Sequence, residues 1–314
     1  MKKIKPWMKI VLSIFIIIVF VGVGAFSYTY YQLSKIKTTE ISKTDVDLGI
    51  KPTTVAKEEV NSEVINIALF GVDRRVANEP ARSDSMIILS IDRKKKKIKM
   101  SSMMRDTYVK IKGHGQTKLT HAYAYGGPEL AIRTLNENFN LNIRDYVTVD
   151  FSNFEKIIDV MGGITIDVQQ DEIASIPQIT KTGPQTLNGL QALAYSRLRY
   201  AAGDDFRRTE RQRTVLSGML VKIQSLGATE FPSVVSKLLP FTETSMNSMD
   251  LIKLGTKVII ANTKILEQAR FPVDGYWSGK MIDKVWYLVA DIKTTADQIH
   301  EFIYEDIKPL NKIP

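Results

Sequence analysis

The feature that most constrains this chain is a long uncharged apolar segment near its start. Residues 10–34 carry no charged side chain, and Ile10 to Phe26 is almost continuous Ile, Val, Leu and Phe. About 20 apolar residues in a helix span the hydrocarbon core of a bilayer. Lysines precede the segment, which favours a cytoplasmic amino terminus, and aromatic residues flank both of its ends, as in membrane interfaces. We therefore expect a single-pass transmembrane anchor over residues 10–31, with the later residues outside the cell membrane.

A cleaved signal peptide is the alternative, because Val23-Gly24-Ala25 has the pattern of a small-residue cleavage site. The apolar core of a signal peptide is usually only about 7 to 15 residues long, which favours the retained anchor. Residues 1–9 are then a cytoplasmic tail. Residues 32–63 are polar with little apolar periodicity, and we expect an extracellular stalk there. Residues 64–314 form the expected extracellular domain.

Composition and charge narrow the chemistry of this domain. The sequence has no cysteine, which excludes disulfides, thiol chemistry and thiolate metal sites. Its formal net charge is +9. A basic protein at the cell surface favours anionic partners, such as lipid phosphates or phosphate-rich polymers. The expected placement argues against nucleic acid, and no helix-turn-helix pattern stands out.

Strand and helix patterns alternate from residue 64 onward. Short apolar runs predict strands at residues 64–70, 86–91, 98–103, 146–151 and 164–168. Helical spacing predicts helices at residues 129–139, 153–160, 188–200, 209–226, 248–261 and 294–304. The basic run Arg93 to Lys97 fits the exposed turn of a hairpin. This alternation predicts an α/β domain with helices layered on a mixed sheet, an α/β/α arrangement.

Polar residues gather beside these predicted elements in four places. They are residues 71–75 after the first strand, 82–86 before the second, 104–107 after the third, and the helical region 195–213. Loops at strand ends are where α/β sheets gather their binding sites. We therefore expect these four places to surround one cleft.

Carboxylates and guanidinium groups dominate the four places. Asp73 and Asp84 flank one loop, and a pair of carboxylates suits Mg²⁺ bound together with substrate phosphates. Guanidinium groups recognise phosphate oxygens through paired hydrogen bonds. The arginines that would do so are Arg105, Arg197, Arg199, Arg208 and Arg211. Each residue alone also fits an ordinary turn, cap or solvated helix face. The residues by themselves therefore indicate an anion-binding α/β domain at the cell surface.

The same residues belong to eight short blocks that follow one another between Ile65 and Leu216. The blocks are Gly71-Val-Asp-Arg, Arg82-Ser-Asp-Ser-Met, Met104-Arg-Asp-Thr, Lys118-Leu-Thr-His-Ala-Tyr-Ala-Tyr-Gly-Gly127, Val149-Asp-Phe, Asp159-Val-Met-Gly-Gly163, Leu187-Asn-Gly-Leu-Gln-Ala-Leu-Ala-Tyr-Ser-Arg-Leu-Arg199 and Asp205-Phe-Arg-Arg-Thr-Glu-Arg-Gln212. In these blocks the chain resembles the LytR–CpsA–Psr family, membrane-anchored proteins of Gram-positive bacteria. The expected anchor agrees with the topology of that family.

The resemblance implies a phosphotransferase. Family members move a glycopolymer, such as wall teichoic acid or capsular polysaccharide, from an undecaprenyl diphosphate carrier to peptidoglycan. Carried over to this sequence, Asp73 and Asp84 would hold Mg²⁺ on the diphosphate. The diphosphate oxygens would be bound by Arg82, Arg105, Arg197, Arg199 and Arg208, with Arg211 and Gln212 in support. Catalysis would rest on Arg105, Arg199 and Arg208, with Asp205 as the candidate base for the acceptor hydroxyl. The prenyl tail would lie in an apolar tunnel walled by Phe151, Phe154, Ile157, Ile158, Leu193 and Leu220.

Three positions depart from the pattern of the family. Ser102-Met-Met stands where Ser-Ile-Pro is common, Thr120-His121 where an asparagine is usual, and Arg207 where glycine is common. None removes an expected Mg²⁺ ligand, and we expect any effect of His121 and Arg207 on the acceptor side. Two other functions stay open from the sequence. One is prenyl-diphosphate hydrolysis, with water in place of the acceptor, and the other is a non-catalytic regulator of the cell envelope.

Overall fold

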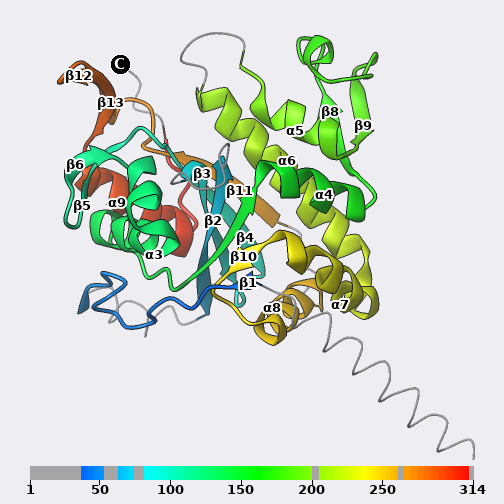
Figure 1. Ribbon diagram of the computed structural model, residues 1–314, viewed down its shortest axis with the longest axis horizontal. Coiled ribbons are helices and arrows are strands. Elements are labelled where there is room, and N and C mark those ends of the chain that lie inside the picture. Colours follow the sequence, from blue (N-terminus) through cyan, green and yellow to red (C-terminus); the bar gives the residue numbers. More distant parts are fainter. Residues whose placement is uncertain (1–36, 53–62, 74–80, 200–204, 261–264, 311–314) are drawn as a thin grey trace, which may run out of the picture.

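The computed structural model describes residues 37–52, 63–73, 81–199, 205–260 and 265–310 (Figure 1). The predicted cytoplasmic tail and the predicted anchor over residues 10–31 lie outside these ranges. Among the helices within them, none combines the length and the apolar character that a membrane span requires. The described residues cover most of the expected extracellular domain, together with part of the predicted stalk.

A seven-stranded mixed sheet forms the centre of the domain. Its strands, in spatial order, are β1 (Lys37–Thr38), β10 (Glu243–Thr244), β7 (Asp145–Asp150), β2 (Val64–Asp73), β3 (Arg82–Asp92), β4 (Lys97–Met103) and β11 (Ile265–Phe271). The β2–β3 and β3–β4 pairs are antiparallel, whereas β7 runs parallel to β2 and β11 parallel to β4. Three two-stranded sheets lie apart from it: β5 (Tyr108–Ile111) with β6 (Gly115–Lys118), β8 (Ile164–Val168) with β9 (Gly183–Leu187), and β12 (Trp277–Ile282) with β13 (Val285–Ala290).

Helices cover both faces of the central sheet, so the predicted α/β/α class is confirmed (Figure 1). One face carries α3 (Thr120–Phe139), α9 (Ile292–His300) and a π-helical turn, η3 (Glu301–Glu305). On the other side lie α4 (Phe151–Val160), α5 (Gly189–Arg197), α6 (Asp205–Ser225), α7 (Gly227–Leu238) and α8 (Ser248–Ile260). Two short 3₁₀ turns, η1 (Ile173–Ser175) and η2 (Leu239–Phe241), complete the described elements.

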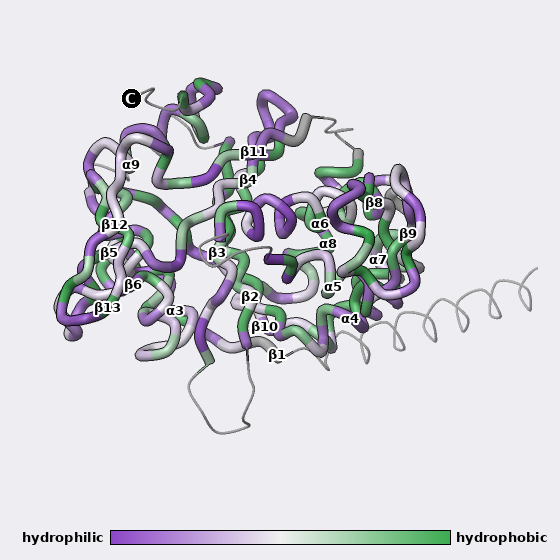
Figure 2. Tube along the Cα trace, turned by 90° about the horizontal axis from the view of Figure 1, so that it is seen from above, coloured by the Kyte–Doolittle hydropathy of each residue, from purple (hydrophilic) through white to green (hydrophobic). Residues whose placement is uncertain are grey.

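The apolar run of β2 is continuous because both of its faces are buried. Ala68 and Phe70 pack into the cluster beneath α3 and α9, whereas Ile67 packs on the opposite face with Val258 of α8. Figure 2 shows the corresponding hydrophobic stretches in the central strands and hydrophilic residues in the outer turns. This two-sided burial fixes β2 and β3 as the rigid support of the strand ends that carry the polar residues.

A β-bulge shapes the end of the β2–β3 pair. Gly71 pairs with Ser85 and Val72 pairs with Ser83, so Asp84 is the extra residue between them. A Cβ atom on Gly71 would lie 3.0 Å from the Cβ of Ser85, so glycine permits this close approach. Bulges redirect side chains at strand ends, and here the bulged residue is one of the predicted carboxylates.

The predicted stalk over residues 32–63 needs correction where the structure describes it. β1 pairs with β10 in the central sheet, and the Leu48 side chain is fully buried. Asn136 of α3 donates a 2.9 Å hydrogen bond to the Leu48 carbonyl. Residues 37–52 therefore belong to the domain: Leu48 and Ile50 are buried in its core, and Ile41 packs against it.

Several predicted elements differ from the observed ones. The helix expected at 129–139 is the second part of α3, which has non-helical backbone at Gly126 and Gly127 and resumes at Pro128. The helix expected from Thr209 begins earlier, at Asp205, and is α6. The strand expected at 164–168 exists as β8 but pairs with β9 outside the central sheet. The sequence patterns after residue 226 did not predict α7, β11 or the β12–β13 hairpin.

Candidate active site

Three separate elements bring charged side chains together at one edge of the central sheet. Asp84 lies in the bulge of β3, Arg105 follows β4, and Asp205 begins α6. The Arg105 guanidinium lies between the two carboxylates: Nη1 is 2.5 Å from Asp84 Oδ1, and Nη2 is 3.1 Å from Asp205 Oδ2. All three side chains are between 16% and 23% exposed, so the group is shielded yet open to a ligand.

Two further arginines contact the carboxylate of Asp205. Arg199 Nη2 lies 3.2 Å and Arg208 Nη1 3.3 Å from Asp205 Oδ1. Arg208 also donates to the backbone carbonyl of Asp84, at 3.4 Å. Three arginines predicted from the sequence thus converge on Asp205, and we call Asp84, Arg105, Arg199, Asp205 and Arg208 the arginine cluster.

A second ion pair borders the cluster. Asp106 lies 3.6 Å from Arg105 and 2.7 Å from Lys118 of β6. Burial alone would lower the pKa of Arg105, but the carboxylates of Asp205, Asp84 and Asp106 outweigh it and raise this pKa. Arg105 is therefore a permanent cation. The sequence interpretation gave Asp106 and Lys118 no role, although both lie inside the quoted blocks.

His121 is a neutral neighbour of this region. Burial, followed by the positive charges of Arg82 and Lys118, lowers the pKa of the imidazole, against the opposing effect of Asp106. Its Nδ1 lies 2.8 Å from the Thr117 hydroxyl. His121 therefore stands beside the cluster as an uncharged imidazole at neutral pH.

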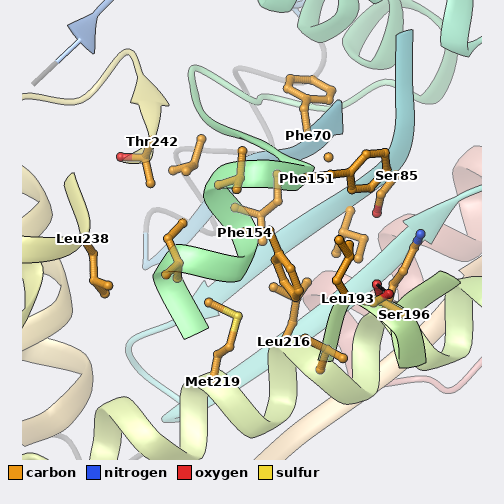
Figure 3. Close-up of a pocket in the computed structure, with 18 residues that line it drawn as sticks. Phe70, Ser85, Phe151, Phe154, Leu193, Ser196, Leu216, Met219, Leu238 and Thr242 are labelled. Atoms are coloured by element: carbon orange, nitrogen blue, oxygen red, sulfur yellow. Dashed lines mark hydrogen bonds between the residues drawn. The ribbon is translucent and has the colours of Figure 1, made fainter. Parts of the chain in front are cut away.

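An apolar cavity of about 270 Å³ begins directly behind the arginine cluster, between the sheet and helices α4, α5 and α6. Ser85, which follows Asp84, and Gln212, one turn after Arg208, line it. Figure 3 shows Ser85 and Ser196 at one side of the cavity and Leu238 and Thr242 at the other, with aromatic rings between them. The cavity therefore has a polar end at the cluster and an apolar body.

Two buried polar atoms at this polar end have no hydrogen-bond partner among the described residues. They are Nε of Arg208, a donor, and Oε1 of Gln212, an acceptor. A buried unsatisfied polar atom costs about 1–3 kcal/mol. Both atoms would gain from a ligand that presents oxygen acceptors and a hydroxyl or water at the junction.

The six predicted tunnel residues divide into two groups. Phe151, Phe154, Ile157 and Leu193 line the cavity. Ile158 is fully buried in a neighbouring cluster with Ile164, and Leu220 packs toward α8, so neither lines it. Ile157 and Ile158 are successive residues of α4 and point about 100° apart; Ile157 faces the cavity, whereas Ile158 points toward Ile164.

The remaining predicted arginines lie around the cluster in different ways. The Arg197 guanidinium covers the ring of Phe151 at 3.9 Å from its centroid, which places it at the rim of the cavity. Arg211 is buried and pairs with Glu172 at 2.8 Å, and it donates to the Leu198 carbonyl. Arg211 thus holds the chain between Arg197 and Arg199. Arg82 is exposed and lies opposite Asp73 in the β2–β3 register.

The two predicted metal ligands are compatible with a shared ion but do not form a complete cage. Asp73 and Asp84 lie at the ends of neighbouring strands, and Asp84 is held by Arg105. Within the described ranges there is no group of three or more His, Asp or Glu side chains arranged for a metal. Mg²⁺ usually binds through one or two carboxylates, waters and substrate phosphates. The donor set therefore fits an ion that arrives together with a phosphate ligand.

Fold and site together define an α/β domain in which a cluster of arginines and carboxylates stands at the polar end of an apolar cavity. The LytR_cpsA_psr family model matches residues 24–302, and the chain belongs to this family. The match extends well beyond the sequence blocks at both ends.

Similar proteins align with most of the chain. The polyisoprenyl-teichoic acid–peptidoglycan teichoic acid transferase TagT of Bacillus subtilis is 33% identical over 242 residues, 72% of this chain and 73% of TagT. The regulatory protein MsrR of Staphylococcus aureus is 33% identical over 250 residues, 78% of this chain and 76% of MsrR. A solved structure of the LytR-CPS2A-psr family protein YwtF (TagT) with bound octaprenyl pyrophosphate lipid aligns with a TM-score of 0.62 and 27% identity. That alignment covers 78% of this chain and 91% of the other.

Proposed function

We propose that this protein is a transferase that moves a glycopolymer, wall teichoic acid or a capsular polysaccharide, from an undecaprenyl diphosphate carrier to peptidoglycan. The proposal rests on one observation above all: the arginine cluster stands at the polar end of an apolar cavity. A prenyl diphosphate has the matching shape, an anionic head on an apolar chain. The relative with bound octaprenyl pyrophosphate lipid and the relative named as a teichoic acid transferase support this choice.

Binding of the donor requires an exchange of partners within the cluster. The guanidinium groups of Arg105, Arg199 and Arg208 are paired with the carboxylates of Asp205 and Asp84, which leaves one positive charge in excess. Diphosphate oxygens would take over these guanidinium groups through paired charge-assisted hydrogen bonds. The displaced carboxylates can then bind a metal ion or accept a proton. Asp84, with Asp73, would hold Mg²⁺, which supplies further neutralisation of the diphosphate when bound.

The reaction is a displacement at phosphorus. The oxygen of an acceptor hydroxyl forms a bond to the phosphorus that carries the glycopolymer, and the bond from that phosphorus to the bridging oxygen breaks. Prenyl phosphate leaves with the electron pair. Asp205, once released by the arginines, is our candidate to accept the hydroxyl proton. Such reactions depend more on positioning and charge stabilisation than on a strong base, which suits a site rich in guanidinium groups.

The product of a purified reaction tests the proposal. The full-length protein in detergent is mixed with a lipid-linked glycopolymer and peptidoglycan fragments. A phosphodiester between polymer and fragment supports transfer, whereas release of prenyl phosphate without this product indicates hydrolysis. A folded Asp84→Ala variant that still performs the protein's cellular role would favour a non-catalytic regulator. We place the domain outside the cell membrane on a single-pass anchor, with no nucleic-acid partner.

A further inference from the structure

Several lysines lie at the edge of the sheet that is opposite the arginine cluster and is formed by the far ends of the central strands. The turn between β3 and β4 exposes Lys94 and Lys96, which form no ion pair with any described residue. Their neighbour Lys95 differs, because it pairs with Asp306. The turn thus presents two cations to the solvent at the far end of the strands from the cluster.

Helix α8 adds a second pair of lysines at the same edge. Lys253 and Lys257 are exposed one turn apart, and Met249, a further turn back, is 48% exposed. The side of this helix that faces the sheet carries the buried Val258, and Leu254 is partly buried beside it. The exposed face of α8 therefore presents two cations and one apolar side chain, and lysines of this kind are attracted to anionic headgroups.

A surface hollow of about 750 Å³ joins the turn to the helix. Arg93 of the turn, Lys253 and Lys257 all line it. Its wall holds the cations Lys43, Arg93, Lys253 and Lys257 and the carboxylates Glu40, Asp145 and Asp250. Lys43 pairs with Asp145, and Arg93 pairs with Glu63, so Lys253 and Lys257 are the wall's two cations that form no ion pair among the described residues. The turn and α8 consequently form one continuous surface, which we call the basic edge and define by Lys94, Lys96, Lys253, Lys257 and Met249.

The apolar end of the cavity lies next to this edge. Leu238 and Thr242 line the end of the cavity that is remote from Ser85 and Ser196 (Figure 3). Ser245 and Met246, only three and four residues further along the chain, line the hollow at the basic edge. Figure 1 shows the same relationship, with α8, β1 and β10 gathered at the end of the sheet where β3 turns into β4.

We propose that the basic edge docks on the anionic phospholipid headgroups of a membrane and turns the Leu238–Thr242 end of the cavity toward the bilayer. Lysines next to an anionic membrane surface are attracted over about one Debye length, about 8 Å at physiological salt. Met249 would insert among the headgroups. β2 has ten residues and spans the two edges, so the arginine cluster stands roughly 30 Å from the headgroups.

This docking is separate from catalysis and can be tested without any reaction. The chain has no cysteine, so a single introduced cysteine takes a fluorescent label at one place only. The full-length Met249→Cys protein is labelled and reconstituted into lipid nanodiscs that contain a headgroup-attached quencher. We expect strong quenching in nanodiscs with phosphatidylglycerol, weak quenching with phosphatidylcholine alone, and loss of quenching at high salt.

Two sets of variants complete the experiment. Each lysine changes partitioning to an anionic surface roughly fivefold, so Lys94→Gln, Lys96→Gln, Lys253→Gln and Lys257→Gln together should abolish the quenching. Lys280→Gln with Lys284→Gln, on the exposed β12–β13 hairpin, is the control and should leave it unchanged. Equal quenching in both lipids, equal quenching of a label at Val285→Cys, or unchanged quenching in the fourfold variant would overturn the proposal.

Discussion

Glu172 and Arg211 form an ion pair of 2.8 Å in which both side chains are only 6% exposed. Arg211 also donates to the carbonyl of Leu198, the residue between Arg197 and Arg199. Glu172, which is not part of the arginine cluster, thus holds Arg211 in place. Arg211 in turn fixes the segment around Leu198 that carries Arg199 of the cluster. The pair also affects its surroundings: burial, and then the charge of Glu172, raises the pKa of Tyr195 to about 12.

Replacing Glu172 should therefore weaken both the fold and the site. A Glu172→Ala substitution leaves the Arg211 charge buried without its carboxylate, which costs about 3–5 kcal/mol of unfolding free energy. Urea unfolding measures the loss. Asp171→Ala is the matched control, because Asp171 pairs with Arg207 at 3.7 Å with both side chains more than half exposed. Such a surface pair contributes under about 1 kcal/mol. An equal loss in the two variants would contradict the importance of the buried pair.

Loss of the central guanidinium should stop transfer without unfolding the domain. Arg105→Ala removes the side chain that contacts Asp84, Asp106 and Asp205, and loss of one such charge stabiliser typically lowers kcat about 10²–10³-fold. Transfer of a lipid-linked donor gives kcat, and circular dichroism confirms that the variant is folded.

The side chain of Arg207 offers a control within the same region. It is 61% exposed and meets Asp171 outside the cluster. Arg207→Ala should therefore lose far less activity than Arg105→Ala. Activity retained by Arg105→Ala, or lost to the same degree in Arg207→Ala, would remove the arginine cluster from the proposed mechanism.

Elements with a strong local pattern could be predicted from the sequence. The run at 64–70 is a central strand because it is buried on both faces, and the apolar residues of α4 lie at helical spacing. The elements that the sequence did not predict depend on tertiary contacts. Leu48 enters the core from a polar segment with no periodicity, and its burial is visible only once α3 lies over it. β11 carries charged and amide side chains because it is an edge strand, so it resembles a loop.

In the candidate site, too, local sequence patterns predicted some features and long-range packing determined the others. Strand-end reasoning placed Asp84 and Arg105 at one cleft, because both follow or precede buried strands. The sequence alone could not show that Asp205, 100 residues after Arg105, would bridge three arginines; the family resemblance led only to Asp205 as a candidate base. Nor could helical spacing reveal that Arg211 faces Glu172, since the β8–β9 region that carries Glu172 is placed by long-range packing.

The chain near its carboxyl end should be sensitive to acid. Asp306 contacts Lys99, lies 3.0 Å from Lys97, and caps the turn whose carbonyls also bind Lys99. Burial would raise the pKa of Asp306, but the hydrogen bonds from the lysines outweigh it and lower this pKa. Because the pKa in the folded state is below the unfolded value of 3.8, the pair stabilises the fold above about pH 4 and loses this effect as the pH falls further.

An Asp306→Asn variant measures that contribution. It should unfold at lower urea concentration than the original protein at pH 7, and the difference should shrink steadily below about pH 4. Asp291→Asn is not a suitable control, because this residue caps α9. Asp283→Asn serves better, since Asp283 lies in the exposed turn of the β12–β13 hairpin. A difference between Asp306→Asn and the original protein that stays constant from pH 7 to pH 3 would show that the charge of Asp306 is not what stabilises the turn.

Filling the apolar cavity should separate lipid binding from folding. Leu193 of α5 lines the cavity, and Leu193→Trp would occupy much of its volume of about 270 Å³ while adding apolar surface to a dry site. We expect the variant to fold, with a cost of about 1–3 kcal/mol from overpacking, and to lose binding of a prenyl diphosphate in a tryptophan-independent assay such as radiolabel retention. Ile158→Val is the control, because Ile158 is fully buried outside the cavity and its loss of one methylene costs about 0.5–1.5 kcal/mol. If Ile158→Val lost lipid as completely as Leu193→Trp did, general destabilisation rather than the cavity would explain both results.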